Sequence, residues 1–255
     1  MNEIFFALII SLAIQVVLFI PAFIFKTDKL TDFSYSLTFI ILTLFLFLTN
    51  NISTSKIILV SMVLIWAFRL GIFLFIRITK IKRDKRFDGV RESFTKFAQF
   101  WILQGIAVWV ILIPSIFFLT QETILTKLSY FGILIWATGF LIETISDAQK
   151  FSFMQGNGKN KSKWISTGLW KYSRHPNYFG EMLCWIGIYL FVVSGLTISQ
   201  ALISIIGPLF IISILLFGTG VPKLEQSADK KFGKIKEYQE YKRRTSLVIL
   251  WPRKR

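Results

Sequence analysis

Apolar residues gather into seven long runs along the chain, and short polar segments separate these runs. The runs cover residues 4–25, 33–50, 57–79, 98–120, 128–146, 177–195 and 198–218. Each is near the length of about 20 residues that an α-helix needs to cross the hydrocarbon core of a bilayer. The pattern predicts an all-α fold, a polytopic membrane bundle of about seven transmembrane helices.

No segment rich in Pro, Gly or Ser divides the sequence, and no repeat of solenoid length is visible. Residues 1–255 are therefore predicted to form a single integral membrane domain. The last run contains Gly207 and Pro208, and a proline inside a helix removes a backbone hydrogen bond. We expect that helix to be kinked near its middle.

The chain has a net charge of +16, and its basic residues are unevenly distributed. Of the 30 Lys and Arg residues, 26 lie in the segments 26–32, 80–97, 147–176 and 219–255. The positive-inside bias of membrane proteins then places the N-terminus outside and the C-terminus in the cytoplasm. It also predicts that 80–97, 147–176 and 219–255 together form a cytoplasmic face. A bacterial inner membrane is the expected location.

Membrane topology accounts for the basic residues, so no nucleic acid partner is expected. The predicted partners are membrane lipids and a small lipid-like substrate. The single cysteine, Cys184, lies inside a predicted helix and fits no metal-binding spacing. No metal is expected.

Ionisable residues in or beside the apolar runs are candidates for function, because charge in a membrane usually faces a cavity or a partner. Glu143 and Asp147 are four residues apart and share one face of a predicted helix. They could pair with a ligand. Alternatively, Glu143 forms a structural pair with Arg69 or Arg77.

The chain's only histidine stands where a basic loop meets an apolar helix, in the segment Arg174-His175-Pro176-Asn177-Tyr178-Phe179-Gly180-Glu181. Pro176 is suited to the first turn of a helix, and the free N–H groups of such a turn attract an anion. His175 could be a local cap. Its polar neighbours favour a site for a phosphate-bearing ligand instead.

The tail from Lys223 to Tyr241 mixes charged and aromatic residues. It could be an amphipathic helix that rests on anionic lipid. It could also be a lid that returns to the segment 147–176 and closes over a ligand.

Four blocks of the sequence resemble the DUF1295 membrane proteins of the steroid 5α-reductase-like superfamily. The most specific block runs from Gly168-Leu169-Trp170 to Glu181. The others are Arg69-Leu70-Gly71, Ser146-Asp147-Ala148-Gln149-Lys150 and the ending from Tyr241 to Trp251-Pro252. One departure is Asp32-Phe33-Ser34-Tyr35-Ser36, where the family commonly has Asp-x-x-Trp-Gly.

The resemblance implies a membrane enzyme that uses NADPH from the cytoplasm to reduce a carbon–carbon double bond in a lipid or steroid-like substrate. It implies that the residues around the cofactor are Asp147, Lys163, Arg174, His175, Asn177, Tyr178, Glu181, Tyr241 and Arg244. When the double bond is conjugated to a carbonyl, hydride transfer places negative charge on the carbonyl oxygen. That oxygen then needs an acid or a cation close to it. The candidates for that role are Asp32, Tyr35 and Arg69.

Two other functions compete with this interpretation. Isoprenylcysteine carboxyl methyltransferases, which use S-adenosylmethionine, also carry Arg-His-Pro-x-Tyr at a helix start and a similar tail. A transporter or scaffold is the second alternative, although the polar residues here cluster at one end of the helices and not at a midplane site.

Overall fold

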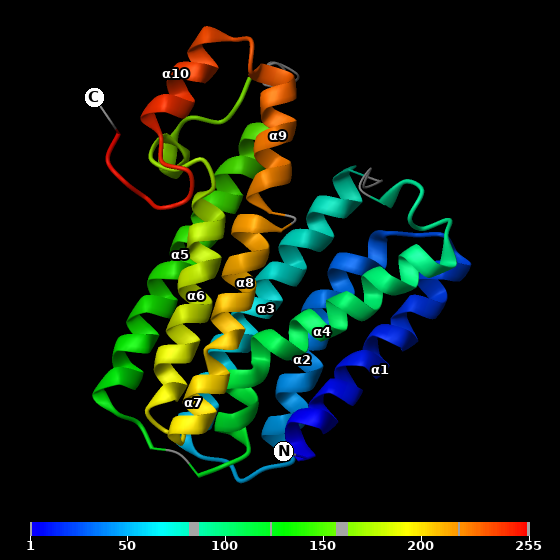
Figure 1. Cartoon of the computed structure of the whole chain (residues 1–255), viewed down its shortest axis with the longest axis vertical. Helices are drawn as coiled ribbons and strands as arrows, with labels where there is room; N and C mark the ends of the chain where they lie inside the picture. Colours follow the sequence, from blue (N-terminus) through cyan, green and yellow to red (C-terminus); the bar gives the residue numbers. More distant parts are fainter. Residues whose placement is uncertain (1, 82–86, 123, 157–162, 219, 254–255) are drawn as a thin grey trace. The chain divides into compact units, whose positions relative to one another are not determined.

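The computed structural model describes residues 2–81, 87–122, 124–156, 163–218 and 220–253. Its elements are the helices α1 (Asn2–Ile24), α2 (Lys29–Leu48), α3 (Thr54–Ile81), α4 (Phe94–Leu119), α5 (Lys127–Gln155), η2 (Gly168–Lys171), α6 (Pro176–Val193), α7 (Ile198–Ser204), α8 (Ile206–Phe217), α9 (Val221–Phe232) and α10 (Lys236–Arg244), which Figure 1 traces in chain order. Seven helical segments of the described chain are long and apolar enough to cross a membrane. The all-α membrane bundle is confirmed. The orientation of the termini stays a prediction.

The chain packs as two compact units. Unit 1 consists of Met1–Tyr130 and Ile188–Gly207, and unit 2 consists of Phe131–Gly187 and Pro208–Arg255. The expectation of a single membrane domain remains a prediction.

In unit 1, α1 packs against α2 and α4, and α2 packs against α3. A polar network lies between α1, α2 and α4. The Gln104 side-chain amide donates to Gln15 Oε1 at 3.0 Å and to Ser34 Oγ at 2.7 Å, and Gln15 donates to Thr38 Oγ1 at 2.7 Å. All four side chains are buried. Such bonds hold transmembrane helices together where no hydrophobic driving force exists between them.

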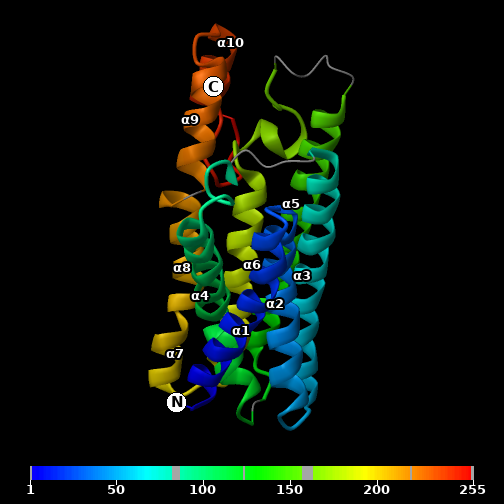
Figure 2. The same cartoon turned by 90° about the vertical axis from the view of Figure 1, so that its right-hand side faces the viewer.

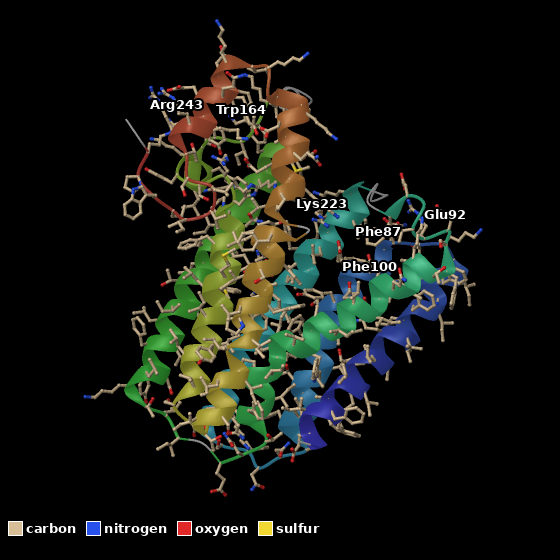
Figure 3. All side chains as sticks on the ribbon, viewed as in Figure 1. Phe87, Glu92, Phe100, Trp164, Lys223 and Arg243 are labelled. Carbon is tan, nitrogen blue, oxygen red and sulfur yellow. The ribbon has the colours of Figure 1, made fainter. Side chains whose placement is uncertain are left out.

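The segment before α4 is anchored to unit 1 by aromatic and ionic contacts. Figure 3 shows Phe87 and Phe100 pointing toward one another, and their ring centroids are 4.9 Å apart. Arg91 is 5% exposed, and its guanidinium donates to Asp28 at 2.8 Å. Neither member of this buried ion pair was a sequence candidate.

In unit 2, α5 and α6 approach closely enough for their backbones to touch. A Cβ added at Gly180 would lie 2.5 Å from the Glu143 nitrogen, and one added at Gly139 would lie 2.6 Å from the Gly180 carbonyl oxygen. Small residues permit this packing between membrane helices. Gly180 belongs to the long motif, so part of that motif serves helix packing.

One helix boundary differs from the sequence prediction, and one interruption agrees with it. α5 continues to Gln155, whereas the apolar run ends at 146, because a helix can continue past the point where its residues cease to be apolar. The last run is interrupted at Ile205, near its middle, as Gly207 and Pro208 predict, and Pro208 stands in the first turn of α8. A proline is tolerated there because the first-turn N–H groups have no helical acceptor.

Candidate functional site

The segment before α6 is fixed to the end of α5 by three contacts within unit 2. The Leu169 N–H donates to Gln149 Oε1 at 3.0 Å, and Trp170 Nε1 donates to the Ser146 carbonyl at 3.0 Å. Gly168 has a φ of +58°, and a Cβ there would lie 2.4 Å from the Gln149 amide nitrogen. The Gly-Leu-Trp part of the motif therefore serves to seat this loop on α5.

The tail returns to the same loop. The Arg174 N–H donates to the Ser246 carbonyl at 2.9 Å, and Ser173 Oγ donates to the Val248 carbonyl at 2.5 Å. The Tyr241 hydroxyl donates to the Trp170 carbonyl at 2.8 Å. In Figure 2, α9 and α10 are the orange and red helices that carry this tail. The tail therefore returns to the described part of the 147–176 segment, as the lid interpretation expects, and closure over a ligand stays a prediction.

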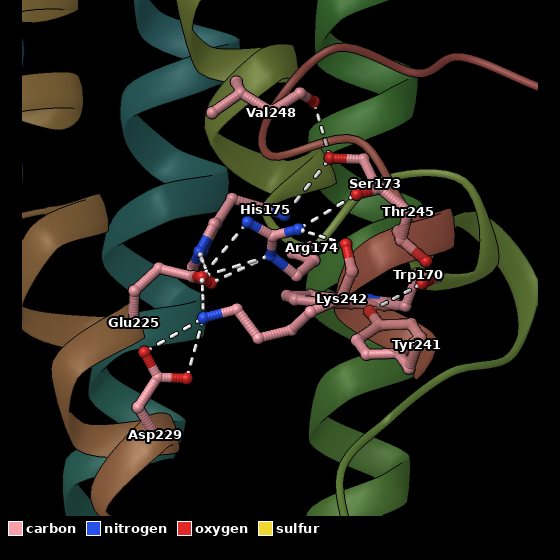
Figure 4. A network of polar contacts seen from close by, with 10 residues as sticks. All are labelled: Trp170, Ser173, Arg174, His175, Glu225, Asp229, Tyr241, Lys242, Thr245 and Val248. Carbon is pink, nitrogen blue, oxygen red and sulfur yellow. Dashed lines mark hydrogen bonds and ion pairs between the residues drawn. The ribbon is translucent and has the colours of Figure 1, made fainter. Parts of the chain in front are cut away.

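Glu225, on α9, is the centre of a charged network (Figure 4). Its carboxylate accepts from Arg174 Nε at 3.1 and 3.2 Å and from His175 Nε2 at 2.9 Å, and it forms an ion pair with Lys242 Nζ at 3.2 Å. Lys242 also reaches Asp229 at 2.7 Å. One carboxylate thus connects the loop before α6 with both tail helices.

The protonation of His175 follows from these contacts. A carboxylate only accepts, so Nε2 carries the proton that faces Glu225. Burial lowers the pKa of His175 below its ordinary value, although the hydrogen bond that its ring donates to Glu225 opposes that shift. The ring is neutral at pH 7, which leaves Nδ1 as an acceptor. Within the described residues Nδ1 is buried and has no hydrogen-bond partner.

Arg174 has its donors engaged inside the protein. Besides Glu225, its guanidinium donates through Nη1 to the carbonyls of Lys242 at 3.0 Å and Thr245 at 2.9 Å. An arginine held by one carboxylate and two carbonyls is a structural clamp for the tail. A contact with a ligand phosphate would have to share these donors.

A cavity of about 470 Å³, here called the unit 2 cavity, opens beside this network. Its volume lies within the range of small-molecule sites. The cationic residues on its wall are Lys150, Lys163, Arg174 and Lys231. The aromatic residues are Phe153, Trp164, Trp170, Phe232, Tyr238 and Tyr241. Glu225 is the one carboxylate among the described residues that line it.

The aromatic wall is a packed cluster contributed by the loop and the tail. The Trp164 ring centroid lies 5.1 Å from that of Tyr238 and 5.7 Å from that of Phe232. Figure 3 shows Trp164 beside the tail helices. Burial raises the pKa of Tyr238 to about 12, so the wall carries no phenolate charge at pH 7. Trp164 Nε1 is buried without a hydrogen-bond partner in the described chain.

Four of the nine predicted cofactor residues, Lys163, Arg174, His175 and Tyr241, line the unit 2 cavity. The other five are absent from the lining given by the described residues. The Asn177 amide donates to Asp147 Oδ1 at 3.1 Å, which joins α6 to α5. The Tyr178 ring is stacked on His175 at 5.7 Å, and Glu181 is half-buried on α6. Arg244 is exposed and contacts Glu240.

The three predicted catalytic residues lie in unit 1. Asp32 on α2 forms an ion pair with Arg77 on α3 at 2.8 Å, so the carboxylate partner of Arg77 is Asp32. The Tyr35 ring contacts Phe39 at a centroid distance of 5.1 Å. The Arg69 guanidinium lies 5.8 Å from the Phe73 ring centroid. Their assignment to proton donation or carbonyl polarisation stays a prediction.

Sequence reasoning missed several residues of the site. The candidate residues did not include Glu225, Lys150, Trp164 or Lys231. Lys150 lies 4.8 Å from the Trp170 ring centroid. The available signal was the aromatic and basic composition of the tail, which does not say which loop it packs against.

The fold is that of an integral membrane helical protein, and its unit 2 contains a cavity lined by cationic and aromatic side chains. A family model described as "Protein of unknown function (DUF1295)" matches residues 18–245. The chain belongs to this family, as the motifs around residues 168–181 predicted. No match was found among curated proteins or among solved structures.

Proposed function

We propose that the protein is a membrane-embedded, NADPH-dependent reductase of a carbon–carbon double bond in a lipid or steroid-like substrate. The observation that carries this proposal is the composition of the unit 2 cavity, with four cationic side chains and one carboxylate beside a wall of aromatic rings. The resemblance of the family to steroid 5α-reductase-like proteins supplies the reaction class.

The charge of the cavity favours a polyanion. The described residues of its wall include four cationic side chains and one carboxylate, Glu225, so the wall has a net positive charge. NADPH carries several phosphate charges, whereas S-adenosylmethionine has a net positive charge at pH 7. Cations in a partly desolvated site attract the first and repel the second.

The aromatic wall fits the heterocyclic parts of a nucleotide. Bases stack on aromatic side chains with about 1–3 kcal/mol each. Trp164 Nε1 can donate and His175 Nδ1 can accept, and both lack partners among the described residues. A ligand with an amide or ribose hydroxyls would satisfy such groups after small local shifts.

NADPH, when bound, would supply the hydride. The residues of the chain would bind its phosphates, exclude water from the ring and hold the tail closed through Arg174 and Glu225. In this account Tyr241 positions the cavity wall, since its hydroxyl is committed to the Trp170 carbonyl. Asp32, Tyr35 and Arg69 stay as candidates for the proton donor and the carbonyl contact.

Titration calorimetry on the detergent-purified protein tests the proposal. We expect saturable NADPH binding and no binding of S-adenosylmethionine at the same concentrations. Saturable S-adenosylmethionine binding without NADPH binding would establish the methyltransferase alternative and refute the reductase.

Two matched lysine variants locate the site. Lys163→Gln removes a cation from the cavity wall, and we expect it to weaken NADPH binding by about 1–2 kcal/mol, the scale of a charge-assisted hydrogen bond. Lys171→Gln removes an exposed cation from the same loop that does not line the cavity, and it should leave the affinity unchanged. Equal effects of both variants would indicate nonspecific attraction.

A further inference from the structure

Unit 1 contains a second cavity of about 610 Å³, which no part of the proposed function uses. It lies among the connections between α2 and α3, α4 and α5, and α6 and α7. Its lining includes Ser53, Lys56, Glu122 and residues 194–197. We call it the unit 1 cavity.

Lys56 is the unusual member of this cavity. It is 2% exposed, although lysine is almost never fully buried unless it has a partner. Among the described residues, no carboxylate lies within ion-pair distance of its ammonium group. Because Lys56 lines the cavity, its ammonium group can attract an anion held there.

The position of Lys56 on its helix strengthens the case for an anion. Lys56 is the third residue of α3, and its backbone N–H donates to Ser53 Oγ at 3.4 Å. The N-terminal end of a helix carries a partial positive charge, which disfavours a lysine and favours an anion. The lysine and the helix end therefore both favour a negative charge at this place.

The cavity also presents one negative group. Glu122 is exposed on its lining, and it acts electrostatically on Lys56 without forming an ion pair with it. A ligand with a single negative charge would leave this carboxylate unmatched. A ligand that carries an anion and a cation a few bonds apart would match both residues.

Exposed apolar side chains also line the unit 1 cavity. Ile52 is 63% exposed and Ile124 is 75% exposed, and both line the cavity. The neighbouring helices α2, α3 and α4 are candidate membrane spans that end or begin within a few residues of the cavity. The cavity thus lies at the level where lipid headgroups meet the acyl chains.

We propose that the unit 1 cavity binds the headgroup of an aminophospholipid, with the phosphate at Lys56, the ammonium group at Glu122 and the acyl chains against Ile52 and Ile124. The opposite charges of Lys56 and Glu122 on one cavity wall match the phosphate and the ammonium group of such a headgroup. This inference is independent of the proposed reductase activity, because the residues belong to the other unit and to a separate cavity.

Native mass spectrometry of the protein, exchanged into micelles doped with equal amounts of phosphatidylethanolamine and phosphatidylglycerol, tests the site. The parent protein should retain phosphatidylethanolamine. Lys56→Met, which keeps the length and removes the charge, should reduce the retained lipid at least tenfold. Lys127→Met removes an exposed lysine that does not line the cavity and should have no effect. Equal retention in the parent and Lys56→Met would overturn the proposal.

A second variant keeps the test decisive if Lys56→Met does not fold. Glu122 is exposed, so Glu122→Gln should fold normally. We expect it to lose the preference for phosphatidylethanolamine over phosphatidylglycerol by at least fivefold. An unchanged preference would overturn the role of Glu122. Displacement of the bound lipid by millimolar inorganic phosphate would overturn the lipid assignment in favour of a free anion.

Discussion

The amide network of unit 1 and the charged cavity of unit 2 differ in how their polar side chains find partners. Between α1, α2 and α4, the amides and hydroxyls around Gln104 bond to one another and are buried together. In unit 2, the polar residues are charged, lie at the helix ends and leave an excess of lysine around a cavity. The first arrangement is complete in itself and stabilises helix packing. The second is the arrangement that we propose a ligand completes, and on that proposal the contrast distinguishes polar residues that pack helices from polar residues that bind.

Helix packing gives the largest expected difference between the units. Gly180→Ala places a methyl group 2.5 Å from the backbone of α5, which cannot move without separating α5 and α6. We expect a loss of about 3 kcal/mol in the free energy of unfolding, at the upper end for overpacking. Gly105→Ala in unit 1 meets flexible side chains of Leu12 and Gln15 at 3.1 Å and should cost much less. Thermal unfolding in detergent would compare them, and equal losses would contradict the close approach.

The charged network of unit 2 gives the next effect. Glu225→Gln keeps the shape of the side chain but leaves Arg174 and Lys242 without their carboxylate. We expect a loss of about 2 kcal/mol, less than for a fully buried ion pair because Glu225 keeps some exposure to water. Trypsin should then cleave the tail at α10 sooner.

Glu240→Gln is the matched control, because Glu240 pairs with Arg243 and Arg244 on the exposed side of α10. Its tail should be digested at the rate of the parent. If Glu225→Gln is also digested at that rate, the clamp between the loop and the tail is refuted.

The amide network of unit 1 should affect stability and leave binding unchanged. Gln104→Leu removes the donor for Gln15 and Ser34, and a hydrogen bond between membrane helices contributes roughly 1 kcal/mol. The melting temperature should fall by a few degrees while NADPH affinity stays at the parental value. If the loss in NADPH binding free energy exceeds the loss in the free energy of unfolding, the Gln104 network contributes to binding, and its assignment to helix packing alone is wrong.

The smallest effect concerns pH. His175 is the only histidine, and its pKa is lowered in the folded protein. As the pH falls through about 6.5, His175 binds a proton in the unfolded chain but stays neutral in the folded chain. Stability should therefore decrease between pH 7 and 6, by less than about 1 kcal/mol, and His175→Gln should remove that part of the pH dependence. Melting curves at these two pH values would reveal it.

Much of the fold follows from the sequence because apolar length is a local property. The seven runs correspond to seven membrane-spanning candidates, and Pro176 begins α6 as its fixed φ suggests. The end of α5 at Gln155 was missed, because hydropathy marks where the membrane ends and not where the helix ends.

The candidate site was predicted only in part. The basic loop ahead of Pro176 indicated an anion site, and Lys163, Arg174 and His175 do line the unit 2 cavity. Glu225 and Trp164 were out of reach, because their roles arise from contacts between residues about 50 to 75 apart in the sequence. The sequence alone also could not reveal that Arg174 is engaged by Glu225 and by two backbone carbonyls.

Hydrogen exchange with and without saturating NADPH tests the central claim most directly. The account predicts slower exchange at residues 163–175 and 221–244, which form the wall of the unit 2 cavity, and no change at 49–57 beside the unit 1 cavity. The same experiment with S-adenosylmethionine should leave both regions unchanged. Protection by S-adenosylmethionine alone, or protection by NADPH that spares 163–175 and 221–244, would contradict the assignment of this cavity to NADPH.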